Sequence, residues 1–154
     1  MKTSELKGIR ILAGLSLEQL GALAEHGEVL DVPASQLIFE QGQPADAMYF
    51  IIDGKVGVYA TGPAGGEVHL RTIETGGHFG EIGLLQAGTR TANVRTITQC
   101  RLSRLDKEAF QGILEVPELA APFLHGLSRS LAIRLADVTN RFADVKSFKD
   151  VWAV

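Results

Sequence analysis

The sequence predicts a mainly β fold, a jelly roll of short strands with helices before and after it. Between about residues 28 and 106, short apolar runs are separated by turn residues, chiefly Gly, Pro, Asp and Asn. Many short strands at regular spacing are typical of a sandwich or a barrel, and we favour the jelly roll among these. On either side of this zone, apolar residues recur at steps of three and four, which indicates N-terminal helices and a long C-terminal helix.

Size and composition indicate one globular domain. A chain of 154 residues with 45% apolar and 21% charged residues suits a single folded unit. The net charge of −3 argues against a free-standing nucleic-acid-binding protein, which normally carries a basic face. Cys100 is the only cysteine, which excludes an internal disulfide and a cysteine-ligated iron–sulfur cluster within one chain. Since no apolar leader or bilayer-spanning run is present, we expect a cytoplasmic protein.

The N-terminal part, about residues 4–27, has the pattern of helices. Ser16 followed by Gln19 is the sequence signature of a capping box at a helix start. An apolar stripe that includes Leu20 and Leu23 follows it. Gly27 is expected to end this helix.

Seven apolar runs within residues 28–106 are predicted to be strands. They are Val29–Val32, Leu37–Phe39, Met48–Ile52, Lys55–Ala60, Val68–Ile73, Ala92–Thr96 and Cys100–Leu105. The pair Asp53-Gly54, between two of these runs, is typical of a hairpin turn.

The C-terminal part, about residues 106–145, is predicted to be helical. Asp106 is placed to cap a helix that ends near Leu114, and the Pro117 region ends or kinks it. A longer helix is expected from about Glu118 to Val145, followed by a tail at 146–154. Its apolar stripe is longer than a small roll easily covers, which favours a dimer contact. The stripe consists of Leu124, Leu127, Leu131, Leu135, Val138, Phe142 and Val145.

The glycine-rich segment from Gly76 to Val94 is the one that offers binding chemistry. Gly80 and Gly83 let the backbone approach a ligand closely. Residues 82–87 suit one short helical turn, whose free N–H groups attract an anion. Arg90 lies just beyond that turn, and its planar guanidinium matches two phosphate oxygens. Thr91 adds a hydroxyl donor.

Glu81 stands out in this anion-binding setting because a carboxylate repels a phosphate. It makes sense if it accepts a hydrogen bond from another part of the ligand, for instance a sugar hydroxyl. Anion donors beside one hydroxyl acceptor suit a phosphate fused to a ribose. A purely structural reading also exists, in which Glu81 caps the turn and Arg90 is its ion-pair partner.

Two motifs resemble the cyclic-nucleotide-binding family. Phe79-Gly-Glu-Ile-Gly-Leu, five further residues and Arg90-Thr-Ala-Asn-Val-Arg-Thr96 are similar to that family's phosphate-binding cassette. Upstream, the segment from Ile38 to Gly54 resembles the strand–turn–strand that precedes the cassette. The family includes the bacterial catabolite activator protein, regulatory subunits of cyclic-nucleotide-dependent kinases and cyclic-nucleotide-gated channels.

The resemblance implies one cyclic-nucleotide-binding domain over residues 1–154, an eight-stranded roll (double-stranded β-helix) with the cassette at 79–91. It implies that Glu81 accepts the ribose 2′-hydroxyl and that Arg90 pairs with the exocyclic phosphate oxygens. The last long helix would cover the purine and form a homodimer seam. The ligand-binding residues so implied are Phe79, Gly80, Glu81, Ile82, Gly83, Leu84, Arg90, Thr91, Ala92, Thr139 and Asn140.

The implied activity is sensing of a cyclic nucleotide, not catalysis, with cyclic AMP (cAMP) favoured over cyclic GMP (cGMP) by analogy with bacterial relatives. No cofactor, metal site or membrane insertion is expected. Direct DNA binding is not expected either, since the chain stops where a helix-turn-helix domain would begin. An unidentified effector chain is the other candidate partner.

Two alternative functions remain open. One is a degenerate, nucleotide-free dimerisation or interaction domain with the same fold. The other is a cupin-type metal enzyme that uses His69, His78 and Glu81, although these lack the close His-x-His pair of such sites.

Overall fold

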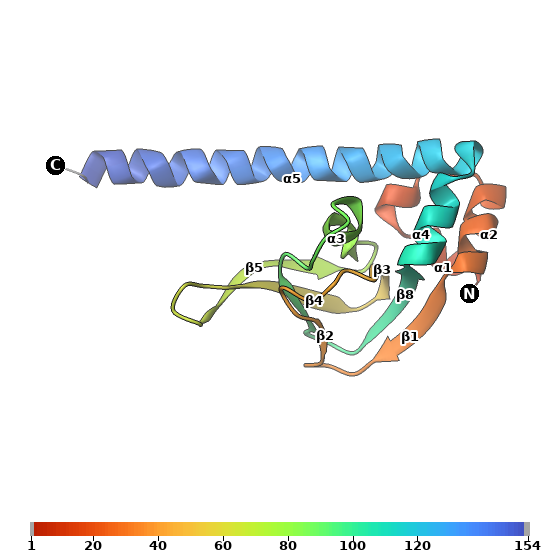
Figure 1. Cartoon of the computed structure of the whole chain (residues 1–154), viewed down its shortest axis with the longest axis horizontal. Coiled ribbons are helices and arrows are strands. Elements are labelled where there is room, and N and C mark those ends of the chain that lie inside the picture. Colours follow the sequence, from red (N-terminus) through yellow and green to blue (C-terminus); the bar gives the residue numbers. More distant parts are fainter. Residues whose placement is uncertain (1, 153–154) are drawn as a thin grey trace.

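The computed structural model describes residues 2–152, with side chains described to residue 147, and contains eight strands in two four-stranded antiparallel sheets (Figure 1). One sheet has the order β1 (Glu28–Val32), β8 (Cys100–Asp106), β3 (Ala47–Asp53) and β6 (His78–Phe79). The other has the order β2 (Leu37–Phe39), β7 (Asn93–Thr96), β4 (Lys55–Thr61) and β5 (Glu67–Glu74). The predicted jelly roll is therefore confirmed.

The seven predicted runs all form strands, whereas the eighth strand, β6, has only two residues and no periodicity that a sequence pattern could reveal. The hairpin predicted at Asp53-Gly54 is wrong, because β3 and β4 belong to different sheets. Gly54 does turn the chain, with a φ of 114°. A turn signal is local, while the pairing of the strands is decided by how the two sheets pack.

The N-terminal part forms α1 (Thr3–Leu6), a 3-10 turn η1 (Arg10–Leu12) and α2 (Leu17–His26). The predicted capping box is present: the Gln19 amide donates to the Ser16 hydroxyl oxygen at 3.1 Å, and the Ser16 amide donates to Gln19 Oε1 at 2.8 Å. Gly27 follows the last helical residue, as expected.

The C-terminal part forms α4 (Lys107–Leu114) and α5 (Pro117–Trp152). The Ala109 amide donates to Asp106 Oδ1 at 2.7 Å, which confirms the predicted cap of α4. The predicted tail at 146–154 is corrected: α5 continues through Trp152, because no glycine or proline interrupts the chain after Val145. Residues 153–154 lie outside the described residues.

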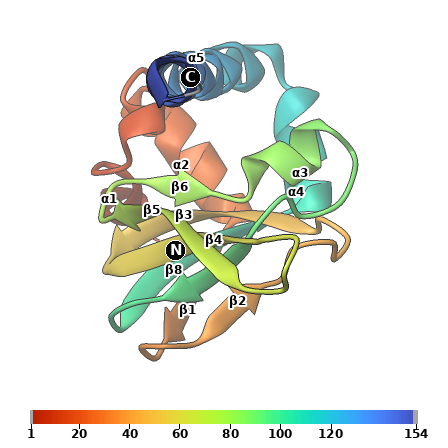
Figure 2. The ribbon, with the colours of Figure 1, turned by 90° about the vertical axis from the view of Figure 1, so that its left-hand side faces the viewer.

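Helix α5 lies over the roll and extends beyond its body along the β4–β5 hairpin (Figure 1). Figure 2, which looks along α5, shows it above the roll, with α1 on one side and α3 (Glu81–Leu85) and α4 on the other. Within residues 2–152, no helix is both long enough and apolar enough to span a bilayer.

Two apolar cores hold these layers together. The interior of the roll is filled by residues such as Val56, Ile51 and Leu102, which are fully buried. A second core joins the helices to the outer side of β3 and includes Phe110 of α4 and Phe123 of α5, whose rings meet edge-on at 5.8 Å. Among the described residues, only the first half of α5 contributes to this core, and further along the helix Leu135, Phe142 and Val145 are more than half exposed.

Candidate functional site

The predicted cassette forms a turn between β6 and the five-residue helix α3. Phe79 ends β6 in the roll interior, where its ring stacks on Tyr49 at 4.9 Å. Gly80 then adopts a φ of 87°, a left-handed conformation that favours glycine. A side chain at Gly80 would also come within 3.0 Å of Arg90 Nη1 and 3.1 Å of the Ala47 carbonyl oxygen. Helix α3 therefore begins at Glu81 with its first amides free of helical partners.

The two family-like motifs form one structural unit. The Arg90 amide donates to the Gln43 carbonyl at 2.8 Å, and the Gly42 amide donates to the Arg90 carbonyl at 2.9 Å. The Ala45 amide donates to the Gly88 carbonyl at 3.1 Å. These bonds hold the loop after α3 against the loop between β2 and β3, which fixes where the Arg90 side chain enters the interior.

Arg90 is 3% exposed, and its guanidinium is held from three sides. Nη1 donates to the Gly80 carbonyl at 3.0 Å, and Nη2 donates to Asp46 Oδ1 at 3.0 Å. The guanidinium carbon lies 3.9 Å from the centre of the Phe39 ring, a cation–π contact. Nε is buried and has no hydrogen-bond partner among the described residues. Burial lowers the pKa of Arg90, and the Asp46 carboxylate offsets part of that effect.

Glu81 is 1% exposed and has polar partners of its own. Its Oε1 lies 3.4 Å from His78 Nε2 and 3.4 Å from Arg134 Nη1, which comes from α5. Burial would raise the pKa of Glu81, but the hydrogen bond from His78 and the charges of His78 and Arg134 outweigh burial and lower it. The carboxylate is therefore ionised and faces α5.

The structural reading of this pair, with Glu81 and Arg90 bonded to each other, does not hold. Arg90 pairs with Asp46, and Glu81 pairs with His78 and Arg134. The two buried side chains thus have separate sets of partners.

The cavity lies between the roll interior, the cassette and α5, and its volume is about 420 Å³. Helix α5 contributes Arg134, Asp137, Val138 and Arg141 to its wall. The other lining residues are Phe39, Val58, Leu70, Arg71, Phe79, Gly80, Glu81, Ile82, Gly83, Arg90, Thr91, Ala92 and Val94.

The charge of the lining is predominantly positive. Four arginines stand against the carboxylates of Glu81 and Asp137. Burial, together with the charge of Arg134, lowers the pKa of Arg71 to about 10. Apolar side chains supply the rest of the surface, so the cavity suits an anion that carries a flat or apolar part.

Most of the predicted site residues meet at this cavity, and three do not. Leu84 is 4% exposed and packs in the helical core, so it anchors α3 from behind. Thr139 and Asn140 are exposed on α5 and are absent from the lining. At about 100° per residue, they point away from the helix face that Arg134 and Asp137 present to the cavity.

Sequence reasoning missed Arg71 and the residues that α5 presents to the cavity. The helical spacing from Arg134 could have identified the α5 residues, since residues three, four and seven positions further along lie on the same face of a helix. His78, named above only as a candidate metal ligand, is a buried strand residue in contact with Glu81.

His69 is not brought to His78 and Glu81. It is exposed on β5, where its ring lies 5.2 Å from that of Tyr59. Within the described part of the chain, no three His, Cys, Asp or Glu side chains are grouped to hold a metal ion.

Comparison with known proteins places this geometry in context. The family model described as the cyclic nucleotide-binding domain matches residues 29–116, more than half of the chain. The chain is 33% identical, over 142 residues, to the CRP-like cAMP-activated global transcriptional regulator of Mycobacterium tuberculosis. That match covers 92% of this chain and 61% of the relative, so the chain spans less than two thirds of that regulator.

Two solved structures share the fold. The catabolite activator protein of Thermus thermophilus gives a TM-score of 0.80 at 28% identity, over 91% of this chain and 64% of that one. The N-terminal domain of a transcriptional regulator from Streptomyces coelicolor gives 0.72 at 29% identity, over 84% and 94% of the two chains. With a roll, a cassette and a covering helix in the matched order, this chain belongs to the cyclic nucleotide-binding domain family.

Proposed function

We propose that the chain is a sensor of a cyclic nucleotide and that the ligand occupies the cavity between the cassette and α5. The observation that carries this proposal is the convergence of Arg90 and Glu81 on one cavity, because both are almost fully buried and chemically opposite. A buried cation suits the phosphate of a cyclic nucleotide, and a buried carboxylate suits its sugar hydroxyl. The remaining cavity wall is apolar enough to hold a base.

Each cassette residue has a proposed role. Arg90 exchanges Asp46 for the exocyclic phosphate oxygens, which is feasible because the Asp46 side chain is 68% exposed and is readily hydrated when released. The free amides of α3 and the exposed Thr91 hydroxyl donate to the same phosphate. Phe79, Gly80, Ile82, Gly83 and Ala92 shape the wall, while Leu84 acts only through its backbone and its packing.

For the base, we propose Val138 with its neighbours Asp137 and Arg141, since these residues of α5 line the cavity. Thr139 and Asn140 face away from the cavity of their own chain. They would contact a base only if α5 rotated or if a second subunit presented them.

We favour cAMP over cGMP as the ligand. The M. tuberculosis relative is named as cAMP-activated, which supports this choice by similarity alone. Thr91 is compatible with either purine, so the choice depends on measurement.

We propose that occupancy is transmitted through α5. Arg134 of that helix contacts the Glu81 carboxylate, so a sugar hydroxyl that binds Glu81 must share this carboxylate with Arg134. Ligand would then stabilise the helix position that closes over it, which is a population shift between two arrangements. The effector that reads this change would be a partner chain or a domain outside this sequence.

We also propose a homodimer through the second half of α5. Leu135, Val138 and Phe142 are 68%, 54% and 68% exposed, and they continue the stripe that is buried at Leu127. Large apolar side chains in a row on one exposed helix face are typical of a helix–helix interface. That this chain does not bind DNA directly, and that it is cytoplasmic, both stay predictions.

Isothermal titration calorimetry with cAMP and with cGMP tests the function. We expect tight binding by the wild type and a severe loss in Arg90→Ala. Truncating one partner of a buried charge pair costs about 2 to 5 kcal/mol, which is at least about 30-fold in affinity. Arg95→Ala, on the outer face of the roll, is the control, and circular dichroism confirms that each variant is folded. Equal binding by Arg90→Ala and the wild type would show that Arg90 does not contact the ligand.

The two alternatives give different results. A nucleotide-free interaction domain binds neither ligand yet still dimerises in analytical ultracentrifugation. A metal enzyme contains stoichiometric metal after purification, although its His69 lies apart from the other two residues in this structure.

A further inference from the structure

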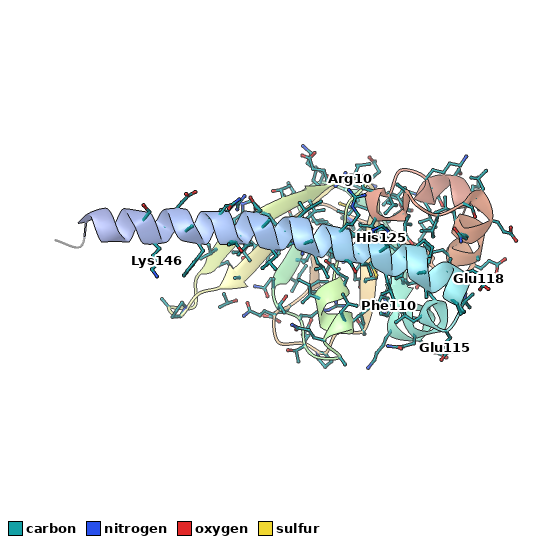
Figure 3. The ribbon with its side chains drawn as sticks, turned by 90° about the horizontal axis from the view of Figure 1, so that it is seen from above. Arg10, Phe110, Glu115, Glu118, His125 and Lys146 are labelled. Carbon is teal, nitrogen blue, oxygen red and sulfur yellow. The ribbon has the colours of Figure 1, made fainter. Side chains whose placement is uncertain are left out.

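A second cavity of about 370 Å³ lies beside the proposed nucleotide cavity, where α5 crosses η1 and strands β5 and β6. The contact between α5 and η1 is close, because a Cβ added at Gly126 would collide with the Ile11 carbonyl oxygen. Figure 3 shows Arg10 beside one edge of α5 in this region. Two walls of the cavity, η1 and the first half of α5, are therefore held together by the helical core.

Positive charge gathers in this second cavity. Arg10 of η1, Arg71 of β5, and Arg129 and Arg134 of α5 line it, and none of its lining residues is Asp or Glu. Among the residues that the structure describes, Arg10, Arg71 and Arg129 form no ion pair, and Arg134 has only the 3.4 Å contact with Glu81. Such a cluster is notable in a chain whose net charge is −3.

The electrostatics indicate that this cluster lacks counter-charge. Burial, and next the positive charge of Arg134, lower the pKa of Arg71 to about 10, while Glu81 offsets only part of that effect. An anion placed among these guanidinium groups would offset their mutual repulsion.

We propose that this cavity is a second anion site, which binds a small organic phosphate of about mononucleotide size. Guanidinium groups match phosphate oxygens in charge and in planar hydrogen-bond geometry. Ser130 lies on the same wall as a hydroxyl donor, and Ile11 and Ile73 give an apolar surface for the organic part.

The second site is coupled to the first through shared residues. Arg71 and Arg134 line both cavities, so an anion in either cavity interacts with the same two positive charges. Occupancy of the second site therefore weakens cyclic-nucleotide binding, and by linkage the nucleotide weakens the second anion by the same factor. The coupling depends on the proposed function, whereas anion binding by itself does not.

Direct titration with inorganic pyrophosphate tests the site. We expect saturable binding by the wild type and at least about tenfold weaker binding by the double variant Arg10→Gln, Arg129→Gln, since each substitution removes a charge-assisted hydrogen bond. The double variant Lys107→Gln, Lys146→Gln has the same change in net charge at exposed positions away from the cavity and is the matched control. Absent binding in the wild type, or equal binding in the two double variants, would overturn the proposal.

A second titration tests the coupling. With pyrophosphate at saturation, we expect cAMP affinity to fall on the order of fivefold in the wild type and to be unaffected in Arg10→Gln, Arg129→Gln. The same fall in both proteins would mean direct competition at the nucleotide cavity and would overturn the coupling. If cAMP does not bind at all, the proposed function fails, while the pyrophosphate titration still decides the second site.

Discussion

At the scale of single residues, Glu81 and Arg90 are both buried, but their charges are compensated by different kinds of partner. The partner of Arg90 is Asp46, whose side chain is 68% exposed, so this bond is easily exchanged for one to a ligand. The partners of Glu81 are a buried histidine and an arginine from α5, so any ligand at Glu81 is in contact with the helix network. Arg90 is thus suited to bind an anion, and Glu81 is suited to transmit the presence of a ligand to α5.

Acid titration of the folded protein checks the environment of Glu81. Its pKa in the fold lies below its usual value of 4.5, so the ionised carboxylate stabilises the fold above that pH. This contribution is lost as the pH falls through the lower folded-state pKa. The difference in the free energy of unfolding between wild type and Glu81→Gln should therefore be largest above pH 4.5 and should shrink as the pH falls below that value. Urea denaturation at each pH measures it, with the exposed Glu25→Gln as control, and a difference that does not shrink would contradict this account.

The close packing at Gly83 gives a second prediction at this scale. A Cβ at Gly83 of α3 would lie 2.5 Å from the Ala45 Cβ, whereas a Cβ at Gly88, in the loop after α3, would lie 3.8 Å from its nearest neighbour. We expect Gly83→Ala to destabilise the protein by about 1 to 3 kcal/mol, because overpacking forces the loop away from α3. Gly88→Ala should change stability by no more than about 0.5 kcal/mol. Thermal unfolding of both variants measures the contrast, and equal midpoints would show that the loop is not packed as described.

At the scale of elements, local signals in the sequence locate most helix ends and strands. The capping residues Ser16 and Asp106 predict the starts of α2 and α4, because capping is a contact between residues three apart. The strand β6 and the end of α5 could not be predicted in this way. The first is two residues long, and the second lies in a segment without a glycine or proline to mark a stop.

The start of α2 gives a prediction for an element. Ser16→Ala removes the hydroxyl that accepts the Gln19 amide, and this should lower the free energy of unfolding by about 1 kcal/mol. Ser128→Ala, at an exposed position inside α5, should be neutral or slightly stabilising because alanine is the better helix former. Guanidinium denaturation of the two variants compares them. Equal stability would mean that the capping box contributes nothing in solution.

At the scale of the whole molecule, the sequence predicts which residues carry the site better than it predicts what surrounds them. The cassette is one continuous segment, so its residues could be named from a motif. Their partners could not be named, since Asp46 is 44 residues from Arg90 and Arg134 is 53 residues from Glu81. The face that a long helix turns toward a cavity depends on how it packs, and for that reason Thr139 and Asn140 were expected where Asp137 and Val138 lie.

The exposed half of α5 sets the prediction for assembly. Phe142→Glu places a charge in the middle of the exposed apolar stripe and should convert a dimer to a monomer, since burying an unpaired charge at an interface is costly. Ser147→Glu, on the opposite face of the helix, should leave the dimer intact. Sedimentation velocity distinguishes the two states. A wild type that is monomeric at all concentrations would rule out the homodimer.

The most direct test of the central claim is a crystal structure of the chain grown with cyclic AMP. The account predicts the nucleotide in the cavity beneath α5, with its phosphate on Arg90 in place of Asp46 and a ribose hydroxyl on Glu81. A cavity without nucleotide at saturating concentration, with Arg90 still bonded to Asp46, would contradict it.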